Sequence, residues 1–329
     1  MIEQYLAYGI WVAIVFIIAG FVALVKGADW LVDGASSIAK NFGISDLVIG
    51  LTVVAFGTSM PEFVVNMVSV AEGTTDLAIT NILGSNIINT FVILGLTALV
   101  YPVASQKRSR DFDIPLSIVA GVMVIVFVAI QLPIGEDMRG IGRIGGATLL
   151  AFFCYFLYNT FRHAKDHPEE TDAEAVKLIP TRRAIALILG GFVGLVVGGE
   201  LIVKSAVDIA TRMGVSEAII GLTIVALGTS LPELATSVIA ATKHNSDIAL
   251  GNVIGSNIFN VFFVLGVSAT VRPLPAYQGI ELDAIMAALG SIIVWLAIKS
   301  NKERKVQRWA GALLVIIYVG YLTYRLLQV

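Results

Sequence analysis

The sequence of 329 residues contains few of the side chains that bind transition metals. It has one cysteine and three histidines. The single Cys154 excludes an intramolecular disulfide and a cysteine-based zinc site. Charged residues make up 14% of the chain, against about 25% in soluble domains. The net charge is −2 and no basic patch is interleaved with aromatics, so nucleic-acid binding is not expected.

Long apolar segments are abundant instead. The hydrophobic fraction is 57%, and a bilayer core of about 30 Å requires about 20 mostly apolar residues per helix. Ten segments meet this requirement: 10–38, 46–71, 75–100, 113–131, 142–161, 183–210, 217–241, 246–270, 282–299 and 306–326. Ser45-Asp46 and Ser216-Glu217 are expected to cap the second and seventh helices. The sequence therefore predicts an all-α integral membrane protein with ten transmembrane helices.

The basic residues of the connecting loops predict the orientation of these helices. With the N-terminus outside, inside segments hold 15 Lys and Arg residues and outside segments hold five. Cytoplasmic loops carry an excess of these residues, so both termini are expected outside a cell (plasma) membrane. We divide the chain into a first five-helix repeat (1–161), a short cytoplasmic linker (162–181) and a second five-helix repeat (182–329). Because five is odd, the second repeat enters the membrane from the opposite side.

One stretch occurs twice, at residues 50–95 and 221–266. The two copies are offset by 171 residues without a gap, and 21 of 46 positions are identical. Each copy places a glutamate, Glu62 or Glu233, directly after a proline in an otherwise apolar segment. A charge inside a membrane costs at least ~2.5 kcal/mol on insertion scales, so such residues usually have a function. Inverted repeats with a polar centre are typical of transporters that bind their substrate near the midplane.

The prolines predict a break in each motif helix. Pro61 and Pro232 lack an N–H, so the carbonyls of Gly57 and Gly228 lose their helical partners. Irregular backbone is tolerated inside a membrane where it is buried in protein or lines a polar cavity. We therefore expect unwound or kinked segments whose carbonyl oxygens are available to a cation.

Every candidate ligand in these stretches is an oxygen. Thr58 and Ser59 precede Glu62 on one helical face, and polar residues spaced by four follow in each copy: Asn81, Ser85 and Asn89, then Asn252, Ser256 and Asn260. Hard cations such as Ca²⁺ prefer six to eight oxygens, whereas softer metals prefer His or Cys. Two glutamates neutralise one Ca²⁺ or two Na⁺. Two such ions that compete for one site can be exchanged across a membrane.

These motifs resemble those of the cation/calcium exchanger superfamily, and within it the prokaryotic type of sodium/calcium exchanger. The resemblance rests on GTSMPE (57–62), GTSLPE (228–233), GSNIIN (84–89) and GSNIFN (255–260). It implies antiport of Ca²⁺ against Na⁺, usually three Na⁺ for one Ca²⁺, by alternating access in which the first and sixth helices slide across the others. It also implies a Ca²⁺ site of Glu62, Glu233, Thr58 and Thr229. The implied Na⁺ and central ligands are Ala55, Ser59, Ser85, Asn89, Ala226, Ser230, Ser256 and Asn260.

Two departures from relatives matter. Some exchangers, including potassium-dependent ones, carry aspartate where this chain has Asn260, so the centre is expected to carry a charge of −2, which disfavours potassium dependence. The linker is too short for the regulatory calcium-binding insert of animal exchangers. We expect Ca²⁺ and Na⁺ as substrates, the lipid bilayer as surroundings, no cofactor and a functional monomer.

Three other functions fit parts of the sequence. A proton/calcium antiporter could use the same carboxylates, since a desolvated glutamate favours its protonated form. A cation channel would conduct without a coupled gradient. An intramembrane hydrolase could use two carboxylates, but the sequence has no catalytic motif of the HExxH or Ser/His type. We therefore predict a transporter, not an enzyme.

Overall fold

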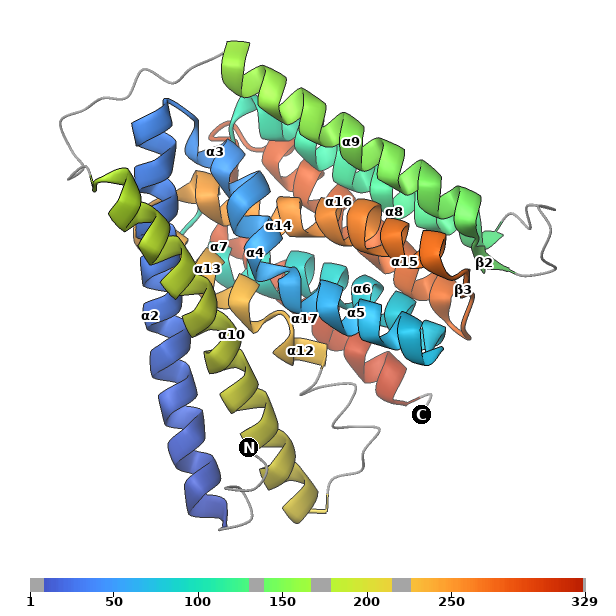
Figure 1. The fold of residues 1–329 in the computed structure, drawn as a ribbon. Coiled ribbons are helices and arrows are strands. Elements are labelled where there is room, and N and C mark those ends of the chain that lie inside the picture. The colour runs from blue at the N-terminus through green and yellow to red at the C-terminus, as the bar shows by residue number, and fades with distance from the viewer. Residues whose placement is uncertain (1–8, 130–138, 167–178, 215–225, 328–329) are drawn as a thin grey trace.

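The computed structural model describes residues 9–129, 139–166, 179–214 and 226–327 (Figure 1). The first half contains α2 (Ile10–Phe42), α3 (Asp46–Ile49), α4 (Ala55–Thr58), α5 (Met60–Glu72), α6 (Thr75–Ile87), α7 (Leu94–Val100), α8 (Ile114–Ala129) and α9 (Arg143–Asp166). The second half contains α10 (Thr181–Arg212), α12 (Ala226–Gly228), α13 (Leu231–Thr242), α14 (Ser246–Ile258), α15 (Gly266–Val271), α16 (Ile280–Ser300) and α17 (Arg308–Leu326). Short π-helical segments lie between some of them: η1 (Gly50–Val54), η2 (Ile88–Ile93), η3 (Ser109–Asp113) and η5 (Phe259–Leu265).

The helices agree closely with the predicted spans. In the described residues, eight helical stretches are long and apolar enough to cross a membrane, and a ninth consists of Asp46–Thr58 and Met60–Glu72, bent by 45°. The predicted span 217–241 begins outside the described residues, as does its capping residue Ser216. Its described part consists of α12 and α13. The predicted cap of the second helix is confirmed, because the Ser45 side chain accepts a hydrogen bond from the Val48 N–H.

Two short antiparallel strand pairs join the halves at opposite ends of the bundle. β1 (Val103–Ala104) pairs with β4 (Lys305–Val306), and β2 (Gly140–Ile141) pairs with β3 (Leu274–Pro275). β1 and β3 are related by the same offset of 171 residues that relates the two sequence motifs. Each strand pair thus joins one strand from each half, and the two pairs occupy equivalent places in an inverted arrangement.

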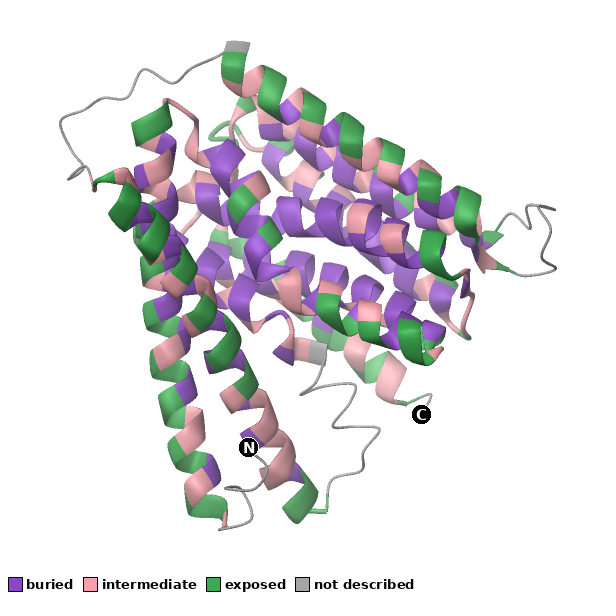
Figure 2. Cartoon of the chain, viewed as in Figure 1, coloured by how far each residue is buried: buried purple, intermediate pink, exposed green. Residues whose placement is uncertain are grey.

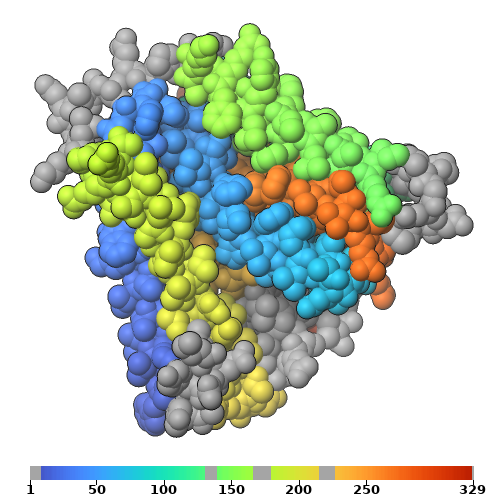
Figure 3. All heavy atoms as spheres, in the orientation of Figure 1, coloured from blue at the N-terminus to red at the C-terminus, as the bar shows by residue number. Residues whose placement is uncertain are grey.

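The long helices α2 and α10 form a separate pair along one flank of the molecule (Figures 1 and 3). Their mutual packing is the most extensive between any two described helices. Glycines set this contact: a Cβ added at Gly20 would lie 2.8 Å from the Gly198 carbonyl oxygen, and one at Gly191 would lie 2.8 Å from the Gly27 oxygen. The offset of 171 exchanges these two contacts, so the helix pair itself has pseudo-two-fold symmetry.

We expect Gly191→Ala to destabilise the protein by about 1–3 kcal/mol, because the new methyl group would collide with backbone that cannot rotate away. Gly190→Ala is the matched control: its Cβ would lie 3.6 Å from the Trp30 ring, an ordinary contact. The melting temperatures of the two variants in detergent, measured by intrinsic fluorescence, test this expectation. Equal melting temperatures would show that the helix pair does not depend on this close approach.

The helices that carry the polar residues spaced by four, α6 and α14, are largely buried in the centre of the fold (Figure 2). In the stretch from α6 to α7, 78% of the most apolar window is buried inside the protein, and in the stretch from α14 to α15 the share is 94%. The windows in α2, α9, α10 and α17 are buried to only 17–28%. Lipid-facing helices therefore surround two central ones, and the central ones carry the candidate ligands.

Candidate cation site

The motif helices are broken at the expected place. α4 ends at Thr58, Ser59 leaves helical geometry with φ −86° and ψ 6°, and α5 begins at Met60 with Pro61 in its first turn. The second motif repeats this conformation: Ser230 has φ −90° and ψ 5°, and α13 begins at Leu231. Glu62 and Glu233 thus stand in the first turn of a helix, where the helix dipole favours negative charge. The predicted interruption is confirmed.

The two glutamates lie at the interface between the repeats and are fully buried. The Ser59 hydroxyl donates to Oε1 of Glu233 at 2.9 Å, and the Ser230 hydroxyl donates to Oε1 of Glu62 at 3.3 Å. Each motif serine therefore bonds the glutamate of the other repeat. Inverted repeats that interlock in this way create one common site.

The second polar segment of each repeat completes these contacts. The hydroxyls of Ser85 and Ser256 approach Oε1 of Glu62 and Glu233 respectively, each at 3.5 Å. These two serines come from α6 and α14, the helices buried in the centre of the bundle. Each carboxylate therefore receives one serine from its own repeat and one from the other.

Several buried oxygens at this interface have no hydrogen-bond partner among the described residues. They are Oε2 of Glu62 and Glu233, Oγ1 of Thr229, Oδ1 of Asn260, and Oδ1 of Asn89. A buried polar atom without a partner is costly, and a buried carboxylate more so. All five atoms can coordinate a cation, and carboxylate, hydroxyl and amide oxygens are the donors that Ca²⁺ and Na⁺ accept. The predicted chemistry of hard-cation binding fits this donor set.

The remaining predicted ligands lie around the same centre or on its flanking segments. Thr58 is buried, and its hydroxyl donates to Oδ1 of Asn252 at 3.0 Å. The Ala55 carbonyl accepts the Ser59 backbone N–H at 3.0 Å, so it already has one partner. Ala226 begins α12. Asn89 and Asn260 lie in the π-helical segments η2 and η5, and both are fully buried.

Sequence reasoning missed the asparagines of the two GSN motifs, Asn86 and Asn257. Asn86 donates to the Asn257 carbonyl at 3.2 Å and accepts from Nδ2 of Asn260 at 3.1 Å. Asn257 donates to the Thr90 hydroxyl at 2.8 Å. These bonds join the central helices of the two repeats. The signal was present in the sequence, because both residues occur at equivalent positions of the repeated stretch.

Two other buried aspartates lie outside the centre, and sequence reasoning missed them as well. Asp113 stands 3.5 Å from the Arg108 guanidinium just before α8. Asp283 lies in the first turn of α16, accepts from the Tyr321 hydroxyl at 2.7 Å and stands 3.4 Å from Arg325. Because an arginine stands beside each of them, Glu62 and Glu233 are the buried carboxylates of the described residues that lack a cationic partner.

A cavity of about 290 Å³ is lined by residues of the centre and by residues around Asp283. Its wall includes Ser85 and Asn81 together with Asp283 and Arg325. A Cβ added at Gly84, which also lines the cavity, would meet no heavy atom within 4 Å. This cavity therefore lies between α17 and the predicted ligand Ser85.

A helical membrane protein with broken helices, pseudo-symmetric halves and buried carboxylates between them has the architecture of a secondary transporter. Comparison with known proteins defines it further. The chain matches the family "Sodium/calcium exchanger protein" over residues 12–162 and 183–327. The chain belongs to the sodium/calcium exchanger family. The predicted fold, an all-α membrane protein of ten transmembrane helices in two inverted five-helix repeats, is confirmed with it.

Individual relatives cover nearly the whole chain. The putative antiporter CaxA of Alkalimonas amylolytica is 38% identical over 94% of this chain and 97% of its own length. The sodium/calcium exchanger MaX1 of Methanosarcina acetivorans is 32% identical over 93% of this chain and 96% of its own. A structure of the sodium-calcium exchanger NCX_Mj, soaked with 10 mM Na⁺ and zero Ca²⁺, superimposes with a TM-score of 0.82 at 31% identity, covering 96% of this chain and 99% of that one.

Proposed function

We propose that this protein is a secondary antiporter that exchanges Ca²⁺ for Na⁺ by alternating access around Glu62 and Glu233. The observation that carries the proposal is the pair of buried carboxylates, each bonded by a serine of the opposite repeat and each with an unpaired Oε2. Cations that bind between the repeats neutralise these charges. Movement of one part of the bundle against the other then exposes the same centre to either side.

The proposed ligands divide between the two ions. Glu62, Glu233, Thr58 and Thr229 hold Ca²⁺, since two carboxylates match its double charge. The Na⁺ or central ligands are Ala55, Ser59, Ser85, Asn89, Ala226, Ser230, Ser256 and Asn260. Both glutamates also lie beside the Na⁺ ligands, because their Oε1 atoms accept hydrogen bonds from Ser59 and Ser230. The two carboxylates are therefore shared between the Ca²⁺ site and the Na⁺ sites. Competition for shared carboxylates is what couples the two fluxes.

We also propose where the protein resides and how its chain is organised. The protein resides in the plasma membrane with both termini outside, functions as a monomer, and needs no cofactor besides its transported ions. The halves 1–161 and 182–329 are its two structural repeats, joined by the cytoplasmic linker 162–181. Thiol labelling from either side of vesicles tests this orientation, with cysteines introduced at exposed Glu303 and Lys302 near the proposed inside face.

The decisive experiment is uptake of radiolabelled Ca²⁺ into proteoliposomes under separately imposed Na⁺, H⁺ and K⁺ gradients. Uptake that follows only the outward Na⁺ gradient supports Na⁺/Ca²⁺ exchange. Uptake that follows the proton gradient alone would assign the protein to proton/calcium antiport. Currents through single open pores without any coupled gradient would make it a channel.

The exchange is also expected to depend on membrane voltage. If three Na⁺ exchange for one Ca²⁺, one net charge crosses per cycle, which is worth about 2.3 kcal/mol per 100 mV. Clamping vesicles with K⁺ and valinomycin at different potentials should therefore change the initial rate of Ca²⁺ uptake. The K⁺ ionophore alone, without a K⁺ gradient, is the control. A rate independent of potential would exclude this stoichiometry and favour two Na⁺ per Ca²⁺.

A further inference from the structure

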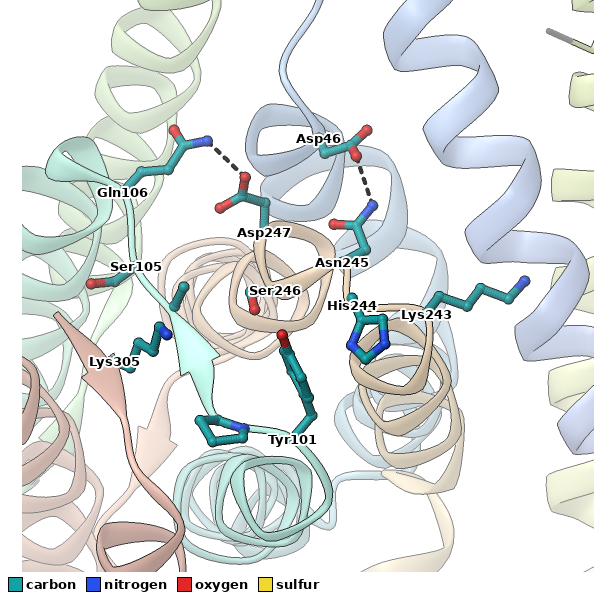
Figure 4. Close-up of a pocket in the computed structure, with 12 residues that line it drawn as sticks. Asp46, Tyr101, Ser105, Gln106, Lys243, His244, Asn245, Ser246, Asp247 and Lys305 are labelled. Carbon is teal, nitrogen blue, oxygen red and sulfur yellow. Dashed lines mark hydrogen bonds between the residues drawn. The ribbon is translucent and has the colours of Figure 1, made fainter. Parts of the chain in front are cut away.

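A lysine at the end of α13 fastens the α2–α10 pair to the rest of the bundle. Nζ of Lys243 lies 2.6 Å from a carboxylate oxygen of Asp29 and 2.6 Å from one of Asp33, both on α2. It also donates to the Asp29 backbone oxygen at 3.2 Å. In Figure 4 the Lys243 side chain points away from the polar pocket beside it, toward a neighbouring long helix. These contacts join the rest of the bundle to the helix pair that slides across it in the mechanism implied by the family resemblance.

The repeat relation assigns each of these residues a counterpart on the opposite side. An offset of 171 converts Lys243 to Glu72, Asp33 to Lys204 and Asp29 to Glu200. Two of the three positions reverse their charge, so a contact between Glu72 and Lys204 would again be attractive. The offset is valid in this region because it converts Gly20 to Gly191 and Gly27 to Gly198. It therefore exchanges the contact between Gly20 and Gly198 with the contact between Gly191 and Gly27.

Only one of the two contacts is formed in this structure. Lys204 pairs with Glu200 one turn away in its own helix, at 2.7 Å, and Glu72 is exposed at the end of α5. The packing of the helices is equally one-sided. α2 packs along α13, whereas no comparable packing joins α10 to α5 in the described part of the chain.

The contact next to Lys243 has no such counterpart. Nδ2 of Asn245 donates to the Ser36 hydroxyl of α2 at 3.1 Å. The equivalent positions are Thr74 and Val207, and valine cannot form a hydrogen bond through its side chain. Of the contacts made by Lys243 and Asn245 to α2, only the charged one therefore has an attractive counterpart in the other repeat.

We propose that the chain carries two alternating ion-pair latches, Lys243 with Asp29 and Asp33, and Glu72 with Lys204. The first holds α2 against α13 when access on that side is closed. The second forms when the α2–α10 pair has shifted so that α10 packs on α5 and access on the other side is closed. Because α2 and α10 pack as one unit, the two latches exclude each other. The inference rests on the proposed alternating access and identifies the residues that bias it.

Charge-exchange variants test the first latch. Half-exposed ion pairs have small energies, so we expect Lys243→Glu to change the distribution between the two states by about two- to fivefold for each lost pair. The double variant Lys243→Glu with Asp33→Lys places in this latch the same charges that Glu72, Lys204 and Glu200 provide on the other side. It should return the distribution to within about twofold of the wild type. A double variant no closer to the wild type than the single one would overturn the proposal.

Crosslinking measures the two states without reference to transport. In a Cys154→Ser background, the pair Asp33→Cys and Lys243→Cys should react with a short bifunctional thiol reagent in the state seen here. The pair Glu72→Cys and Lys204→Cys should react in the opposite state, and more strongly when Lys243→Glu is added. A reactive 33/243 pair with a 72/204 pair that never reacts under any Na⁺ or Ca²⁺ condition would contradict the second latch. If the wild type carries no Ca²⁺ against Na⁺, the proposed function fails, while the crosslinks still report on the latches.

Discussion

Replacement of either central carboxylate, by Glu62→Gln or Glu233→Gln, should abolish Ca²⁺ exchange. The two side chains have nearly the same shape, and the amide oxygen can still accept the serine hydroxyls that now bond Oε1. The variant loses only the charge. At an effective dielectric constant near 20, one charge pair at 4 Å is worth about 4 kcal/mol, which corresponds to about a thousandfold weaker Ca²⁺ binding. Initial rates of radiolabelled uptake into proteoliposomes measure the loss.

The same variants should not be less stable in the absence of ions. Both glutamates are fully buried, and removal of a buried charge relieves its desolvation. Saturating Ca²⁺ should therefore raise the melting temperature of the wild type, by mass action, and not that of either variant. Glu281→Gln provides the control, since it makes the same change at an exposed position in the first turn of α16. Wild-type uptake by either central variant would refute the site.

Asn252→Ala is expected to have the next largest effect. The Asn252 amide accepts from the Thr58 hydroxyl at 3.0 Å and donates to the Ser237 hydroxyl at 2.9 Å and to the Glu233 carbonyl at 3.2 Å. Each buried group left without a partner costs about 1–3 kcal/mol. We expect Ca²⁺ exchange to fall by about a hundredfold, because Thr58 and Glu233 come from different repeats and lose the side chain that positions both.

The repeat supplies a matched control for this variant. Asn81 is the counterpart of Asn252, but it is only half-buried and donates to Oδ1 of Asn66 at 3.0 Å. Asn81→Ala should therefore reduce exchange by about tenfold or less. Uptake rates and melting temperatures of Asn252→Ala and Asn81→Ala, measured side by side, show whether the loss is larger at position 252. Equal losses would show that the bond between Asn252 and Thr58 has no special part in holding the site together.

The sequence was sufficient for the spans and for the position of the break. Helix lengths follow from apolar runs. The proline before Glu62 lacks a backbone N–H, so it interrupts the helix whatever packs around it. Ser45 was identified as a cap because its side chain accepts a hydrogen bond from a residue only three positions later, Val48. Each of these features depends on neighbours in the chain, so local physical chemistry determines it.

Contacts between distant residues could not be predicted in the same way. The bond between Ser59 and Glu233 joins residues 174 positions apart, and its geometry depends on how closely the repeats interlock. The ion pair between Asp29 and Lys243 likewise joins residues 214 positions apart. The π-helical turns that contain Asn89 and Asn260 were also missed, because a spacing of four residues predicts an ordinary α-helical face.

The two small strand pairs have a consequence for biosynthesis. β1 lies at residues 103–104, but its partner β4 is synthesised about 200 residues later, at 305–306. β2 likewise waits for β3 at 274–275. The N-terminal half emerges first from the ribosome, with neither strand partner yet made. The two ends of the first five helices therefore lack these strand partners in the membrane until β3 and β4 have been synthesised.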